Sequence, residues 1–307
     1  MTASETTVDD DDLPAAPATA ASRAWSDYVA MTKPRLNLLV VLTTLAGYYL
    51  GMDGEAPIAR LIHTVLGTTL VAGGASVLNQ VWERDTDRLM RRTRTRPLPS
   101  ARLAPTPALW FGVALSAIGL AELWFLANPL SALVAFLTVL SYVIVYTPLK
   151  LKSSLSTIVG AVPGALPPLI GWAAATNSLS AGGWALFGIV FFWQMPHFLA
   201  IAWMHRDDYA RAGMPLLPVV DPSGRSTGRQ AVLYAAAMIP VSLLPTLLGL
   251  AGPRYLATAI VLGAVVLWLS FEFAATRTHA TARRLFFVTI IYLPLLWGAL
   301  VVDHATR

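Results

Sequence analysis

Asn79, Glu83 and Asp87 place side-chain oxygens at every fourth position at the end of an apolar segment. Residues four apart lie on one face of a helix, so the three side chains would point the same way. Hard cations such as Mg²⁺ prefer oxygen ligands and are often bound together with a phosphate group. A solvated helix end with local arginine pairs would explain a single aspartate, but the set of three favours a magnesium site.

A run of arginines follows directly, between Met90 and Pro97. Most of them could simply mark a cytoplasmic loop, where basic residues gather in membrane proteins. Arg92 and Arg96 differ because they lie beside the predicted metal ligands, where guanidinium groups can hold a diphosphate through paired hydrogen bonds. We therefore expect these two arginines to bind a diphosphate.

A histidine, His197, stands next to a proline inside another apolar segment. Ionisable residues within a membrane span are expensive, so His197 is a functional candidate, although a histidine bonded to a backbone carbonyl is the alternative. Gln194, Asp207 and Asp208 lie toward the same membrane face, which favours function. We expect His197 and Gln194 to contact a substrate, and Asp207 and Asp208 to complete the metal site from a second helix.

Three prolines and three glycines fall between residues 160 and 171. Such a segment must bend or break a membrane helix, which is tolerated where the freed backbone lines a cavity or packs against neighbouring helices. Close helix packing through small residues is the other explanation, and both can hold. A pocket beside this segment is expected.

These residues must be positioned by membrane helices, because 56% of the chain is hydrophobic and only 13% is charged, against roughly 25% charged in ordinary soluble domains. Nine apolar runs reach the length of a membrane crossing, near residues 36–52, 61–82, 105–126, 129–147, 155–175, 182–204, 230–251, 255–274 and 285–302. The sequence thus predicts an all-α polytopic bundle of nine transmembrane helices. With no cysteine, disulfides, zinc–thiolate sites and thiol catalysis are excluded.

The basic residues predict how the bundle is oriented. Alternate segments, beginning with the N-terminal one, hold 19 of the 22 lysines and arginines. Since cytoplasmic loops collect basic residues, we expect the N-terminus in the cytoplasm, the C-terminus outside and the active site facing the cytoplasm. The net charge of +5 might suggest nucleic-acid binding, but the basic residues lie in short loops between apolar segments, which argues against it.

Residues 1–27 lack the pattern of a signal peptide and are predicted to be a disordered cytoplasmic tail, leaving 28–307 as the membrane domain.

The motifs together resemble the UbiA-type prenyltransferases, in the form found in protoheme IX farnesyltransferases (haem O synthases). The resemblance covers residues 28–218 most clearly. It rests on the matching segments Thr32-Lys33-Pro34-Arg35, Asn79 to Leu98, Tyr146-Thr147, Gly164 to Trp172, Trp193 to Phe198 and Asp208 to Pro215.

The resemblance implies a reaction at the plasma membrane with Mg²⁺ as cofactor. Farnesyl diphosphate ionises, the 2-vinyl group of haem B attacks the allylic cation, and water captures the product cation to give haem O. It also implies further site residues: Asp85 for the metal, Lys33, Arg35 and Lys150 for the diphosphate, and Tyr146 for haem or substrate. A haem A synthase is the partner expected alongside.

Three positions depart from the family pattern. Glu83 replaces the usual aspartate and is one methylene longer, Leu151 stands where arginine is common after Lys150, and Ser156 occupies a position often held by asparagine. Diphosphate binding near Leu151 would therefore depend on Lys150 and Lys152.

Two other functions fit part of the pattern. Another prenyltransferase of the family, acting on a quinone precursor or a chlorin, would share the metal site but should lack the segment from Trp193 to Phe198. A secondary transporter would also have broken helices, but its two halves are often similar and its polar residues lie at mid-membrane, whereas these carboxylates cluster at one surface.

Overall fold

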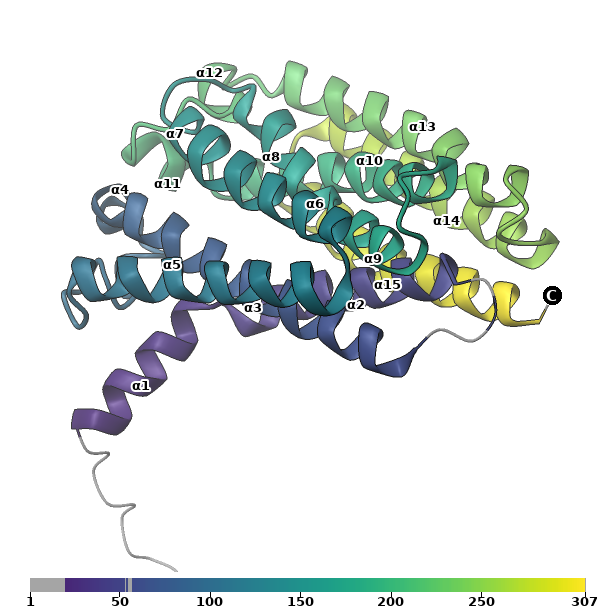
Figure 1. Cartoon of the computed structure of the whole chain (residues 1–307). Helices are drawn as coiled ribbons and strands as arrows, with labels where there is room; N and C mark the ends of the chain where they lie inside the picture. Colours follow the sequence, from purple (N-terminus) through teal and green to yellow (C-terminus); the bar gives the residue numbers. More distant parts are fainter. Residues whose placement is uncertain (1–19, 53, 55–56, 307) are drawn as a thin grey trace, which may run out of the picture.

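The computed structural model describes residues 20–52, 54 and 57–306, and every regular element among them is helical. Of the predicted tail, residues 1–19 lie outside the described residues, and residues 20–27 belong to a helix that extends away from the bundle (Figure 1). The elements, in chain order, are α1 (Ala20–Met31), α2 (Pro34–Leu50), α3 (Ile58–Trp82), α4 (Arg84–Leu89), α5 (Pro105–Glu122), η2 (Leu123–Ala127), α6 (Pro129–Leu140), η3 (Ser141–Tyr146), α7 (Thr147–Leu149), α8 (Ser156–Ala165), α9 (Pro167–Thr176), α10 (Ala181–Met204), α11 (Arg206–Arg211), α12 (Leu217–Val220), α13 (Arg225–Leu247), α14 (Pro253–Thr276) and α15 (His279–Ala305).

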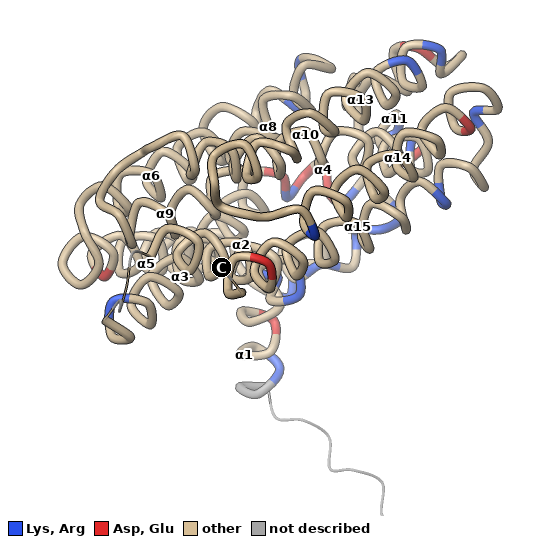
Figure 2. Tube along the Cα trace, turned by 90° about the vertical axis from the view of Figure 1, so that its right-hand side faces the viewer, with Lys and Arg blue, Asp and Glu red and all other residues tan. Residues whose placement is uncertain are grey.

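Eight continuous helical segments of the described chain are long and apolar enough to cross a membrane, and they match the last eight predicted spans. The first predicted span forms α2, which is shorter at 17 residues but packs inside the same bundle, against α9 and α3. Figure 2 shows charged residues at helix ends and in connecting loops, while the long helical stretches are uncharged. The chain is therefore a multi-pass membrane protein, as predicted.

Prolines begin several of these helices. Pro34, Pro105, Pro129 and Pro253 occupy the first turn, where a missing backbone N–H leaves no intrahelical hydrogen bond unmade. Before Pro129, the Asn128 side chain accepts a hydrogen bond from the backbone N–H of the third residue of α6, and its amide donates to two carbonyls at the end of α9. Asn128 thus fixes the short turn between the third and fourth predicted spans.

The predicted break in the fifth span divides it into α8 and α9 at Leu166, just before Pro167. The carbonyl of Pro167, at the start of α9, accepts a hydrogen bond from the Thr44 hydroxyl of α2 at 3.2 Å, which ties the break to a neighbouring helix. Gly47 and Gly171 sit where α2 and α9 meet, and a Cβ at either would collide with the opposite backbone. The break therefore brings α2 against α9 through small residues.

Candidate active site

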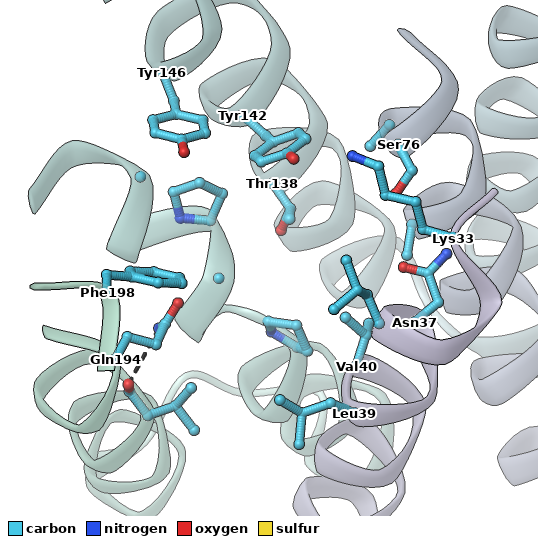
Figure 3. Close-up of a pocket in the computed structure, with 18 of the residues that line it drawn as sticks. Lys33, Asn37, Leu39, Val40, Ser76, Thr138, Tyr142, Tyr146, Gln194 and Phe198 are labelled. Atoms are coloured by element: carbon cyan, nitrogen blue, oxygen red, sulfur yellow. Dashed lines mark hydrogen bonds between the residues drawn. The ribbon is translucent and has the colours of Figure 1, made fainter. Parts of the chain in front are cut away.

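A cavity of about 410 Å³ opens between α2, α3, η3, α8 and α10 (Figure 3). One end carries lysines and tyrosines, namely Lys33, Lys150, Tyr142 and Tyr146. Most of the remaining wall is apolar, with α8 and α9 supplying its glycines and prolines. The structure thus confirms the expected pocket beside the broken span. A mostly apolar cavity with few polar groups is typical of a small-molecule site.

Lys33 reaches this cavity from the junction of α1 and α2. Its backbone is left-handed, with φ 51°, a conformation that is costly for a residue other than glycine and is found at functional sites. The Lys33 ammonium donates to Asn79 Oδ1 at 3.3 Å, and the Asn37 amide steadies the junction by donating to the carbonyl of Thr32. Burial, reinforced by the charge of Arg96, lowers the pKa of Lys33 to about 8.

Glu83 and Lys150 form a buried ion pair across 67 positions of sequence, with Lys150 Nζ donating to Glu83 Oε1 at 2.7 Å. Burial alone would raise the pKa of Glu83, but the attraction of Lys150 outweighs it and holds that pKa below its ordinary value. Burial likewise opposes the charge on Lys150, but its neighbours, including Glu83, raise its pKa. Both groups are therefore ionised at neutral pH.

Asp87 is fully buried at the end of the predicted motif. Arg96 Nη1 donates to Asp87 Oδ2 at 2.7 Å, and the Thr93 hydroxyl donates to the Asp87 carbonyl, which folds the arginine-rich loop back onto α4. Among the described residues, Asp87 Oδ1 has no hydrogen-bond partner. A buried carboxylate oxygen without a partner is costly, so this atom is suited to a cation that the protein alone does not supply.

The three predicted oxygen ligands therefore share one property: each is buried and contacts a different basic side chain that was predicted to bind diphosphate. Asn79 contacts Lys33, Glu83 contacts Lys150 and Asp87 contacts Arg96. Asn79 also donates to Thr147 Oγ1 at 3.1 Å, which ties α3 to α7. Of these groups, Lys33 and Lys150 line the cavity, and the three oxygen ligands lie behind its lining.

Two contacts join the arginine-rich loop to α11. Asp208 accepts a hydrogen bond from the backbone N–H of Arg91 at 3.3 Å and pairs with Arg211. Arg92 donates to the hydroxyl of Tyr209 at 3.2 Å. Because Tyr209 lines the cavity, α11 contributes to its wall.

Three other predicted residues are not brought into this cluster. Asp85, with 69% of its side chain exposed, pairs with Arg84, and Asp207, with 88% exposed, lies 3.8 Å from an arginine of its own helix. Arg35 is exposed on the first turn of α2. Within the described chain, no three Asp, Glu or His side chains are close enough to form a metal site by themselves. Amide and phosphate oxygens would have to contribute.

Two tyrosines lie between the charged end and the rest of the cavity. The rings of Tyr142 and Tyr146 stack with centroids 5.4 Å apart, and Lys150 Nζ lies 5.3 Å from the centroid of Tyr146. Tyr146 was predicted from the resemblance, whereas Tyr142 was missed. The spacing of Tyr142, Tyr146 and Lys150 at every fourth position is the signal that could have identified it.

Gln194 and His197, which were predicted to contact a substrate, line the cavity from α10. The Gln194 amide donates to the carbonyls of Ala161 and Val190, joining α10 to α8. Gly164 provides the space, because a Cβ there would collide with the Gln194 amide. The broken span thus sets the position of a polar side chain in the cavity wall.

The His197 ring stacks against both Trp193 and Phe286, with ring centroids 5.3 and 5.0 Å away. Its Nδ1 lies 2.9 Å from Thr289 Oγ1 of α15. Phe286 and Thr289 were missed because they lie about 90 positions beyond His197 in an apolar span, where the sequence carries no signal for them.

The model of the UbiA prenyltransferase family matches residues 40–291. Among curated relatives, the protoheme IX farnesyltransferase of Solibacter usitatus is 48% identical over 287 residues, covering 91% of this chain and 98% of that protein. The protoheme IX farnesyltransferase of Opitutus terrae is 47% identical and covers 93% of this chain and 97% of its own length. The protoheme IX farnesyltransferase of Myxococcus xanthus is 45% identical, and the match covers 92% of this chain and 96% of that protein.

Solved structures share the fold at low sequence identity. A structure described as digeranylgeranylglyceryl phosphate synthase superposes with a TM-score of 0.79 at 16% identity, covering 93% of this chain and all of the other. A UbiA homologue from Aeropyrum pernix gives a TM-score of 0.68 at 19% identity, covering 86% of this chain and 97% of that one. A UbiA homologue from Archaeoglobus fulgidus bound to GPP and Mg²⁺ gives a TM-score of 0.60 at 15% identity, covering 89% of this chain and 99% of that one. The fold is that of the UbiA homologues, as predicted.

Proposed function

The chain belongs to the UbiA prenyltransferase family, and from that premise we propose that it transfers the farnesyl group of farnesyl diphosphate to the 2-vinyl group of haem B. The C1–O bond of farnesyl diphosphate breaks, the terminal vinyl carbon bonds to C1, and water adds a hydroxyl to the inner vinyl carbon. The remaining proton leaves with the diphosphate, and the other product is haem O. The relatives named protoheme IX farnesyltransferase, which align over nearly the whole chain, support this reaction.

The observation that carries the proposal is a single cavity with a charged end and an apolar body. At the charged end, Lys33 and Lys150 line the cavity and are positioned by Asn79 and Glu83, and Arg96 is held close to Lys33 by Asp87. Cations held in advance by fixed partners can stabilise the negative charge that develops on a departing diphosphate without reorganising. We assign the diphosphate to this end, with Arg92 reaching it from the loop.

We assign Mg²⁺ to the same end. The unpartnered Oδ1 of Asp87 fits this assignment, as does the oxygen donor set of Asn79, Glu83 and Asp208. When bound, Mg²⁺ would neutralise part of the diphosphate charge. The fold shared with a homologue solved with GPP and Mg²⁺ offers a precedent. Asp85 and Asp207 are exposed and paired with arginines, so we leave them out of the ligand set.

The rest of the cavity suits the farnesyl chain and the porphyrin. The stacked rings of Tyr142 and Tyr146 border the charged end, where aromatic faces can stabilise positive charge on the allylic carbon. The apolar wall limits the water that could capture this carbon before the vinyl group attacks. We place the haem toward His197 and Gln194, on the wall formed by α10.

We further propose that the charged end of the cavity faces the cytoplasm, with the N-terminus inside and the C-terminus outside. The basic residues on alternate segments support this orientation in the plasma membrane. Haem O would leave into the membrane, where a haem A synthase is the partner we expect to consume it.

Expression in a host that lacks its own haem O synthase tests the proposal. Extracted haems, separated and weighed by mass spectrometry, should include haem O when the wild-type chain is present and none when Asp87→Asn replaces it. Haem B as the only haem in membranes that contain the wild-type protein would contradict the proposal. Accumulation of a prenylated quinone precursor would point to the other prenyltransferase function instead.

A further inference from the structure

The His197 imidazole is held by two aromatic rings and one hydroxyl group. Trp193 and Phe286 both stack on the ring, with interplanar angles of 22° and 26°. The Trp193 indole is itself fixed, since its N–H donates to the Thr289 carbonyl at 2.6 Å. The orientation of the His197 ring is therefore set by α10 and α15 together.

Thr289 also decides which ring nitrogen carries the proton. Its hydroxyl has one hydrogen, which it donates to the carbonyl of Phe286 at 2.7 Å. The contact between Thr289 Oγ1 and His197 Nδ1 must then be a hydrogen bond donated by Nδ1. A neutral imidazole protonated at Nδ1 leaves a lone pair on Nε2.

His197 lines the cavity, whereas Thr289 of α15, which its Nδ1 contacts, does not. Nε2 is therefore the ring nitrogen left to face the cavity. His197 lies eight residues before His205 at the end of α10, or about 12 Å below that helix end at 1.5 Å per residue. The nitrogen is thus presented within the body of the cavity, away from the charged end.

Two roles suit a fixed nitrogen lone pair: accepting a proton from water and binding a metal. A proton acceptor would become an imidazolium, which requires a carboxylate or similar partner on Nδ1. In the described part of the chain, the contacts of the His197 ring are aromatic rings and one hydroxyl that is already donating. Metal binding needs no charge on the ring, and ligating histidines almost always donate their other N–H to a fixed acceptor.

We propose that Nε2 of His197 is an axial ligand of the haem iron when haem B is bound, with Thr289 as the positioning residue that fixes its tautomer. This inference rests on the proposed function, because haem is the substrate that brings the iron. Coordination would anchor the porphyrin at its centre while its vinyl edge remains free to meet the allylic carbon.

The decisive experiment compares haem B with metal-free protoporphyrin IX, each titrated into the purified protein in detergent. The wild type should bind haem B more tightly than the metal-free ring, since only haem B can be coordinated. In His197→Ala this preference should disappear. An equal preference in both proteins would overturn the proposal.

Thr289 is tested by two substitutions of similar size. Thr289→Val removes the acceptor for Nδ1 and should reduce the preference for haem B about tenfold or more, whereas Thr289→Ser retains the hydroxyl and should behave as the wild type. Resonance Raman spectra of the ferrous complex provide a readout that mere structural damage would not imitate. The wild type and Thr289→Ser should show an iron–histidine vibration. If the wild type lacks this vibration, the proposal is overturned, whether or not the variants fold.

Product analysis separates this inference from the proposed function. If the wild type makes haem O but shows neither the vibration nor the preference for iron, coordination by His197 is refuted and the transferase function stands. If the wild type makes no haem O, the proposed function fails, and binding of the iron porphyrin through His197 would still be decided by the titrations.

Discussion

Lys33 combines a left-handed backbone with a buried ammonium group whose pKa is lowered to about 8. Burial disfavours the charged form, so in the free enzyme the ammonium loses its proton as the pH rises through about 8. A neutral Lys33 would no longer attract diphosphate. We therefore predict that kcat/KM for farnesyl diphosphate falls above about pH 8.

The matched variant is Lys33→Arg, because a guanidinium stays charged throughout this range. Its activity relative to its own maximum should not fall between pH 8 and 9. Steady-state kinetics across pH values with haem B held constant measures both profiles, and identical alkaline limbs would rule out Lys33 as the titrating group.

The buried and exposed carboxylates of the motif should differ in their importance. Asp87→Asn keeps the shape but removes the charge that faces Arg96, and we predict a loss of about 100-fold or more in kcat at saturating Mg²⁺. Asp208→Asn should behave in the same way. Asp85→Asn, at a mostly exposed position, should change kcat less than about threefold. Comparable losses for Asp85→Asn and Asp87→Asn would contradict this distinction.

Glu83 is the residue in which this chain departs from the family pattern. Glu83→Asp restores the usual residue but shortens the reach to Lys150, which Glu83 contacts at 2.7 Å. We predict that the variant is as active as the wild type or more active, because aspartate is the usual residue at this position in the family. Turnover at limiting Mg²⁺ checks this, and a loss as large as that of Asp87→Asn would show that the extra methylene is required.

At the scale of elements, the break between α8 and α9 positions Gln194 through Gly164. Gly164→Ala should insert a methyl group into the space of the Gln194 amide and reduce the free energy of unfolding by about 1–3 kcal/mol, as overpacking typically does. Gly298→Ala is the control, because a Cβ there meets nothing within 4 Å and alanine favours a helix by about 1 kcal/mol. Thermal unfolding in detergent should place the two variants on opposite sides of the wild type.

The helices could be predicted because long apolar runs and prolines act locally. The four-residue spacing of a helix correctly predicted that Asn79, Glu83 and Asp87 lie together, since all three belong to one stretch of chain. It could not identify which cation each would meet, since Lys150 approaches Glu83 from 67 positions away and Thr289 approaches His197 from 92. Such pairs depend on how the helices pack. Small residues such as Gly164 permit this packing, but in the sequence they cannot be told apart from other glycines in membrane helices.

For the whole molecule, the proposed membrane orientation can be tested by cysteine labelling, because the chain has no native cysteine. Arg94→Cys in the exposed arginine-rich loop should be protected from an impermeant thiol reagent added to intact cells. Leu179→Cys, in the loop between α9 and α10, should react. Labelling of residue 94 but not of residue 179 would invert the assigned topology.

The central claim is that one cavity joins farnesyl diphosphate to haem B and adds water. Purified protein in lipid vesicles, supplied with both substrates, Mg²⁺ and water enriched in ¹⁸O, tests it most directly by mass spectrometry of the haems together with a diphosphate assay. Haem O and diphosphate should form in equal amounts, with ¹⁸O in the new hydroxyl group of haem O. Release of diphosphate without haem O, or no release at all from protein that binds both substrates, would contradict the account.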